Sequence, residues 1–140
     1  MRATANFTID ELIRSATAER LGIENFPDPE EMDNLHMLAE KILQPLRNAW
    51  QRPIIVTSGY RCPALNRALR GSKNSQHLMG QAADIRAVDA ADNKALFHTA
   101  LRLIQEGRLQ VGQLIDEHEY QWIHISLPTS RIRYQILHLP

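Results

Sequence analysis

Cysteine is almost absent from this chain of 140 residues: only Cys62 is present, so no internal disulfide bond can form. A single thiol fits a reducing compartment. An excess of either charge is also missing, because 16 basic side chains balance 16 acidic ones. The chain therefore has no overall basic field, which argues against nucleic acid as its main partner.

Long apolar runs are missing as well. None approaches the roughly 20 residues that cross a bilayer, so we expect no membrane partner. The first residues carry no apolar segment ahead of Asp10, Glu11 and Arg14, and we therefore expect synthesis in the cytoplasm without a signal peptide. Repeats, low-complexity tracts and linkers are not found, so residues 1–140 are expected to form one domain with one core.

Helical signals occur in four parts of the chain. Thr8 and Glu11 have the spacing of a capping box. The second helix has apolar residues at spacings of three and four, and Pro45 inside it should cause a kink or a break. The expected helices cover residues 8–22, 28–49, 63–70 and 89–107.

Five shorter stretches are β-branched or alternate between apolar and polar residues, which predicts strands. The third and fourth are close enough to form a hairpin, and the last should be an edge strand. Together with the helices they predict an α+β fold, with an antiparallel β-sheet and helices packed on one side. The expected strands are 53–57, 81–86, 111–116, 121–127 and 131–137.

Three polar side chains suggest a metal site: His77, Asp84 and His124. Imidazole and carboxylate are ligands of Zn²⁺ in open catalytic sites, where three protein groups leave one position for water. A loop followed by a returning strand can bring His77 and Asp84 together, and strand alternation would turn His124 away from Ile123 and Ile125, which should face the core. Each ligating imidazole should also donate its second N–H to a carbonyl or carboxylate.

Plainer readings exist for each of these residues. A single histidine is usually a surface or a satisfied core residue. Asp84 alone could be a turn or cap residue. Arg61, a further candidate just after the first expected strand, could be a surface charge. We apply the plain reading to the remaining histidines, which are His36, His98, His118 and His138.

The order of three motifs resembles the D-Ala-D-Ala metallopeptidase family of zinc peptidases. The motifs are Ser58-Gly59-Tyr60-Arg61, then Ser-x-His-x-x-Gly-x-Ala-x-Asp over residues 75–84, then Trp122-Ile123-His124. This family includes D-alanyl-D-alanine carboxypeptidases and dipeptidases, and phage endolysins that cut peptidoglycan stem peptides. The resemblance covers nearly the whole chain and implies the fold shared with the hedgehog N-terminal domain.

The resemblance also implies roles for single residues. His77, Asp84 and His124 would be the ligands of Zn²⁺. Arg61 would bind the substrate's carboxylate or polarise the scissile carbonyl, a role suited to a guanidinium that is always charged. Ser75 would help to hold the site or the substrate.

The catalytic carboxylate is expected on the hairpin, a few residues before the last histidine. Gln121 stands three residues before His124 and cannot act as a base, so Glu117 and Glu119 are the candidates. We choose Glu117, because it follows its strand as the acid does in the small single-domain branch of the family. The alternative is that both are solvated turn residues. Trp122 stands where some relatives have a histidine.

The implied function is hydrolysis of D-residue-containing peptide bonds in peptidoglycan stem peptides or cross-links. The rival is a non-catalytic zinc-binding module that recognises cell-wall peptide or a protein partner. A purely structural zinc site is a third reading, although such sites usually have four protein ligands. Since peptidoglycan lies outside the cytoplasm, release as a phage-type lysin would reconcile substrate and location. The bond that is cut and the choice between endopeptidase and carboxypeptidase stay open, and we favour a monomer.

Overall fold

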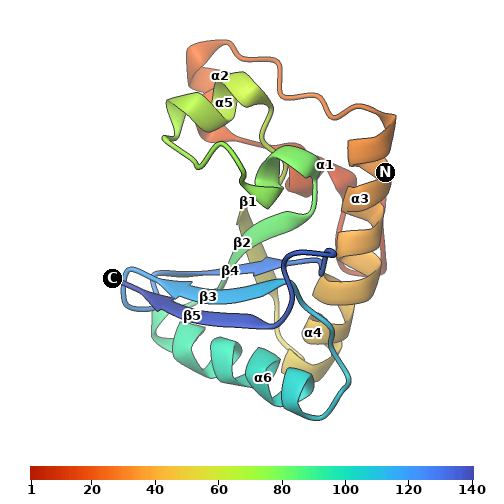
Figure 1. The fold of residues 1–140 in the computed structure, drawn as a ribbon, viewed down its shortest axis with the longest axis vertical. Helices are drawn as coiled ribbons and strands as arrows, with labels where there is room; N and C mark the ends of the chain where they lie inside the picture. The colour runs from red at the N-terminus through yellow and green to blue at the C-terminus, as the bar shows by residue number, and fades with distance from the viewer.

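The computed structural model describes all residues, 1–140, as helices on and around one five-stranded sheet (Figure 1). The α-helices are α1 (Ile9–Ile13), α2 (Ala16–Leu21), α3 (Pro29–Leu38), α4 (Gln44–Trp50), α5 (Pro63–Ala68) and α6 (Asn93–Gln105). A π-helical turn, η1 (Ala39–Leu43), and two 3₁₀ turns, η2 (Gln76–Met79) and η3 (Ala90–Asp92), complete the helical part. The strands are β1 (Ile54–Ser58), β2 (Ala82–Ala87), β3 (Gln113–Glu117), β4 (Trp122–Ser126) and β5 (Gln135–Leu139). None of the helices has the length and apolar character of a membrane span.

The first expected helix is interrupted in the middle. Its two ends are confirmed: Thr8 and Glu11 form the capping box, and Gly22 ends the helix in the left-handed conformation. Between them Arg14 leaves the helical region with φ −59° and ψ 137°, and the Ser15 side chain accepts a hydrogen bond from the backbone of the next helix. Serine favours such capping over a place inside a helix, and the segment therefore forms α1 and α2.

The second expected helix runs on through Pro45 without a break. The structure accommodates the missing N–H of Pro45 with the π-helical turn η1 directly before it, where the Gln44 N–H donates to the Ala39 carbonyl. Such turns absorb a local irregularity while the chain continues in the same direction. The expected break at Pro45 is therefore absent, and the local irregularity takes the form of this wider turn.

The sheet has the strand order β1-β2-β4-β3-β5. The α+β class, the β3–β4 hairpin and the place of the last strand at an edge are confirmed. One detail differs, because β5 pairs with β3 in parallel while the other three pairings are antiparallel. The segment after β4 crosses to the far side of the hairpin, where Tyr134 and Gln135 bond to the backbone just before β3, so β5 runs in the direction of β3.

One apolar cluster of 24 buried residues joins the sheet to α1, α3, η1, α4 and α6. Figure 1 shows α6 along the sheet, the α3–α4 helix at its side, and α2 with α5 at the opposite end of the molecule. On β2 and β4 every second residue belongs to this cluster. The residues between them face away from the core, and they carry the polar site.

Candidate metal centre

Asp84 and His124 lie directly opposite each other on β2 and β4. Their chain neighbours, among them Ile85 and Ile123, are buried in the core. Because side chains alternate along a strand, the two polar residues share the other face of the sheet. The register of this one strand pair therefore places two of the three expected ligands side by side.

His77 reaches the same place from the 3₁₀ turn η2. We expected a loop that ends near this residue, and the structure shows a short turn held at both ends. The Ser75 hydroxyl accepts from the His77 N–H at 3.1 Å, and Gly80 ends the turn with φ 71°. A Cβ atom on Gly80 would lie 2.5 Å from the Glu31 carbonyl oxygen, so the turn packs closely against α3. Ser75 thus positions His77 through its backbone.

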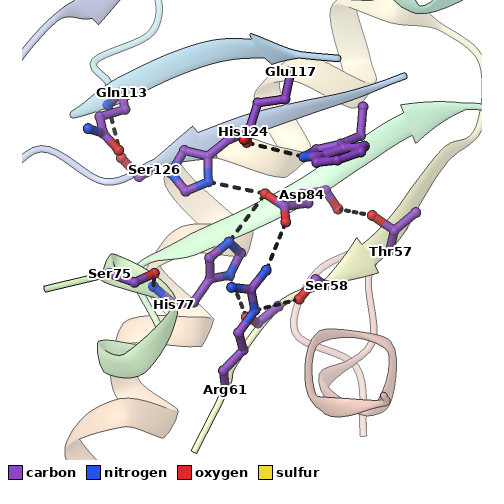
Figure 2. Close-up of polar contacts among 12 residues, drawn as sticks. Thr57, Ser58, Arg61, Ser75, His77, Asp84, Gln113, Glu117, His124 and Ser126 are labelled. Atoms are coloured by element: carbon purple, nitrogen blue, oxygen red, sulfur yellow. Dashed lines mark hydrogen bonds and ion pairs between the residues drawn. The ribbon is translucent and has the colours of Figure 1, made fainter. Parts of the chain in front are cut away.

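The three side chains converge around one carboxylate oxygen. Oδ1 of Asp84 lies 3.2 Å from Nε2 of His77 and 3.1 Å from Nδ1 of His124. One ligand atom from each residue lies within 4.8 Å of the other two. All three residues are buried, with 3% of His77 and 7% of Asp84 and His124 exposed. Figure 2 shows both imidazole rings and the Arg61 guanidinium pointing toward the Asp84 carboxylate.

The hydrogen bonding of His77 fits a cation at this point. Its Nδ1 lies 2.7 Å from the Gly59 carbonyl oxygen, which only accepts, so Nδ1 carries the proton. A neutral His77 then presents the lone pair of Nε2 to the Asp84 carboxylate, and two acceptors repel each other unless a positive charge lies between them. A divalent metal ion supplies that charge, and imidazole with carboxylate is a donor set for zinc. The expected second hydrogen bond is thus present for His77, whereas Nε2 of His124 is buried without a partner.

Arg61 binds the other oxygen of Asp84. Its Nη2 lies 3.1 Å from Oδ2, and its Nε donates to the Ser58 hydroxyl at 3.0 Å. Burial by itself would raise the pKa of Asp84, but its contacts with His124 and His77 outweigh burial and hold that pKa well below its usual range. Asp84 is therefore ionised at neutral pH, as a metal ligand must be.

Two buried asparagines that the sequence did not single out hold Arg61 in place. The Asn25 amide donates to the Tyr60 carbonyl and its oxygen accepts from the Cys62 N–H, on either side of Arg61. Asn66 lies 3.5 Å from Nη1 of Arg61. Their partners are distant in the chain or in a loop, so no local pattern identifies them. Only their burial, visible in the fold, reveals the role.

A cleft of about 560 Å³ opens over the convergent side chains. Arg61, Ser75 and Glu117 line it together with His77, Asp84 and His124. Glu117 lies opposite Trp122 in the hairpin, and the indole Nε1–H donates to Glu117 Oε2 at 3.1 Å. Glu119 is exposed in the turn and does not line the cleft.

Comparison with known proteins agrees with this geometry. A search among curated proteins returns no match. A family profile described as Peptidase M15 matches residues 5–126, which include every residue of the cluster and of the hairpin. The chain therefore belongs to the M15 peptidases, the D-Ala-D-Ala metallopeptidase family that its motifs resemble.

Proposed function

We propose that this protein is a zinc-dependent peptidase that hydrolyses D-residue-containing peptide bonds of peptidoglycan stem peptides or cross-links. Membership of a metallopeptidase family supports the reaction class. The observation that carries the proposal is the convergence of His77, Asp84 and His124 within 4.8 Å, beside a carboxylate in the same cleft. The substrate class is supported by the resemblance of the motifs.

His77, Asp84 and His124 would hold the zinc ion through Nε2, Oδ1 and Nδ1, the atoms that face one another. When bound, zinc supplies Lewis acidity that lowers the pKa of a coordinated water toward about 7 and leaves it reactive at neutral pH. Three protein ligands leave room for water, which argues against a closed structural site.

Glu117 would act as the base. Its Oε2 is held by the Trp122 indole, while Oε1 has no hydrogen-bond partner within the chain and is free to accept a proton. As the water oxygen attacks the peptide carbonyl carbon, Glu117 takes the proton from that water. It then donates the same proton to the leaving amine nitrogen as the C–N bond breaks.

Arg61 would stabilise the negative charge that develops on the carbonyl oxygen. Its Nη2 and Nε are bound by Asp84 and Ser58, whereas Nη1 makes only the 3.5 Å contact with Asn66. A guanidinium fixed at one side and open at the other suits this electrostatic role.

Peptidoglycan as substrate places the reaction outside the cytoplasm, and release as a phage-type lysin would deliver the enzyme there.

The test is digestion of purified muropeptides by wild-type protein, by Glu117→Gln and by the control Glu119→Gln. We expect a chelator to abolish turnover and zinc to restore it. Glu117→Gln should lower kcat/KM by roughly 10²- to 10⁴-fold, whereas Glu119→Gln should stay within about twofold because Glu119 does not line the cleft.

Two results would contradict the proposal. One is turnover that persists after complete removal of metal, and the other is activity that survives in Glu117→Gln. Tight binding of zinc and muropeptide without any cleavage would instead identify a non-catalytic zinc-binding module.

A further inference from the structure

One cationic side chain on the cleft has no partner of its own. Arg70 lines the cleft together with His77, Asp84 and Glu117, and its side chain makes no hydrogen bond or ion pair with the rest of the chain. The only other arginine on the cleft is Arg61, and its charge is balanced by Asp84 at 3.1 Å. The positive charge of Arg70 is therefore available to a ligand.

The backbone of Arg70 is held in an unusual conformation. Its φ is 58°, in the left-handed region that glycine adopts freely and larger residues adopt at a cost. Residues kept in such conformations by their surroundings cluster at ligand-binding sites. Arg70 therefore occupies a position that glycine would adopt at lower cost, on a loop that lines the cleft.

The loop around Arg70 is fixed against the site. The Gly71 N–H donates to the Asn66 carbonyl at 2.8 Å, and the Asn66 side-chain amide donates to the Ser72 carbonyl at 2.9 Å. A Cβ atom on Gly71 would lie 3.1 Å from Nη1 of Arg61. Arg70 therefore directly precedes a residue whose backbone lies beside the Arg61 guanidinium, in a loop that two hydrogen bonds tie to Asn66.

We infer that Arg70 binds a free carboxylate of the peptide substrate close to the scissile bond, so that the cleft selects acidic peptides. A planar guanidinium recognises a carboxylate through two parallel hydrogen bonds. The inference rests on the proposed peptidase function and adds a specificity residue to it. The carboxylate has two possible sources: the C-terminus of the substrate, as in a carboxypeptidase, or an acidic residue inside a longer peptide, as in an endopeptidase.

The experiment uses zinc-loaded protein and two pairs of muropeptide-derived peptides. One pair differs only in a free or amidated C-terminus, and the other only in a free or amidated internal carboxylate. The variants are Arg70→Gln, Arg70→Gly and the control Arg67→Gln. Arg67 is exposed on α5, has no ion pair and does not line the cleft.

Arg70→Gln should raise KM roughly 10- to 100-fold for the carboxylate peptide of one pair, with kcat within about twofold, and should leave the amide peptide unaffected. The pair that shows this effect identifies the source of the carboxylate. Arg70→Gly should lose the same preference while melting at or above the wild-type temperature, because glycine fits the backbone. Arg67→Gln should behave as wild type.

The inference is overturned if wild-type protein treats acid and amide peptides alike, or if Arg70→Gln weakens both members of a pair equally. A failure of the proposed function is a separate result, in which the wild-type protein cleaves no peptide. In that case, calorimetric titration of the zinc-loaded protein with the acid and amide peptides still tests whether Arg70 binds the carboxylate. Tighter binding of the acid peptide that is lost in Arg70→Gln supports the inference, and equal binding of acid and amide peptides contradicts it.

Discussion

The Gly59 carbonyl orients the His77 ring, whose other nitrogen faces Asp84. The Gly59 carbonyl accepts from Nδ1 at 2.7 Å. A Cβ atom on Gly59 would lie 2.2 Å from the Leu12 carbonyl oxygen, so any larger residue must displace this backbone. The orientation of this proposed metal ligand therefore depends on the close approach of α1 to the end of β1.

Gly59→Ala should lower the free energy of unfolding by about 1–3 kcal/mol, because the added Cβ atom overpacks the site. It should also weaken zinc binding roughly 10- to 100-fold, because the hydrogen bond that supports His77 is disturbed. Urea unfolding and competition with a chelating dye measure the two effects. Gly22→Ala is the control: φ is 68° there and nothing lies within 4 Å of the added Cβ atom. It should cost about 1 kcal/mol and leave zinc affinity unchanged. Wild-type zinc affinity in Gly59→Ala would contradict the role of its carbonyl.

Trp122 orients the carboxylate that we propose as the base. Trp122→Phe removes the N–H that holds Glu117 Oε2 at 3.1 Å, and we expect kcat/KM to fall about 10-fold because a hydrogen bond to a charged group is lost. The same change at Trp50 is the control, since Nε1 of Trp50 is buried without a partner. Steady-state kinetics on muropeptides should show no change for Trp50→Phe. Equal activity of the two variants would argue against positioning by Trp122.

At the scale of elements, the parallel strand β5 is attached to β3 by a polar pair beside the core. Asp116 is buried, and its Oδ2 bonds to Nδ1 of His138, its direct partner on β5. The His138 ring also lies 5.4 Å from the Phe97 ring of α6. The last strand is otherwise largely exposed, so this pair is a main contact between its side chains and the rest of the molecule.

His138→Ala should lower the free energy of unfolding by about 1–3 kcal/mol, because it leaves the buried Asp116 carboxylate without a partner. A double-mutant cycle with Asp116→Asn isolates the pair, and the two changes together should cost less than the sum of the single ones. Urea unfolding measures all four proteins. Strict additivity would show that the two side chains do not stabilise each other.

The elements that the sequence predicted are those with strong local signals. Capping residues, apolar periodicity and β-branched runs identified nearly every helix and strand within a few residues. The break at Ser15 was missed because the apolar pattern continues across it. The parallel direction of β5 was missed because it depends on where residues 127–134 cross the sheet, and hydrogen bonds to Val111 and Gly112 decide that.

The site residues divide in the same way, into those with a local sequence signal and those without one. His77, Asp84 and His124 were accessible from the sequence because ligand chemistry and motif order point to them. Asn25, Asn66 and Arg70 were not singled out, since their roles arise from burial or from a position on the cleft. Those properties depend on contacts between distant segments, which no local pattern records.

At the scale of the whole molecule, three distant segments meet at the proposed metal centre, so metal binding should stabilise the entire fold. At a zinc concentration about 100 times Kd the gain is about 2.7 kcal/mol, equivalent to roughly 10 °C in Tm for a domain of this size. Thermal melts with zinc and with a chelator measure it. His77→Ala should abolish the difference, while His36→Ala on α3 should preserve it. If the wild-type protein has the same Tm with zinc and with a chelator, the proposed site is contradicted.

The pairing of Asp84 with His124 has a consequence for how the chain matures. A shift of β2 against β4 by a single residue would turn one of these side chains toward the hydrophobic core and separate it from the other. Only the native alignment can then capture the ion. Metal binding would therefore stabilise the native register of the sheet and would leave chains with a shifted register without this stabilisation.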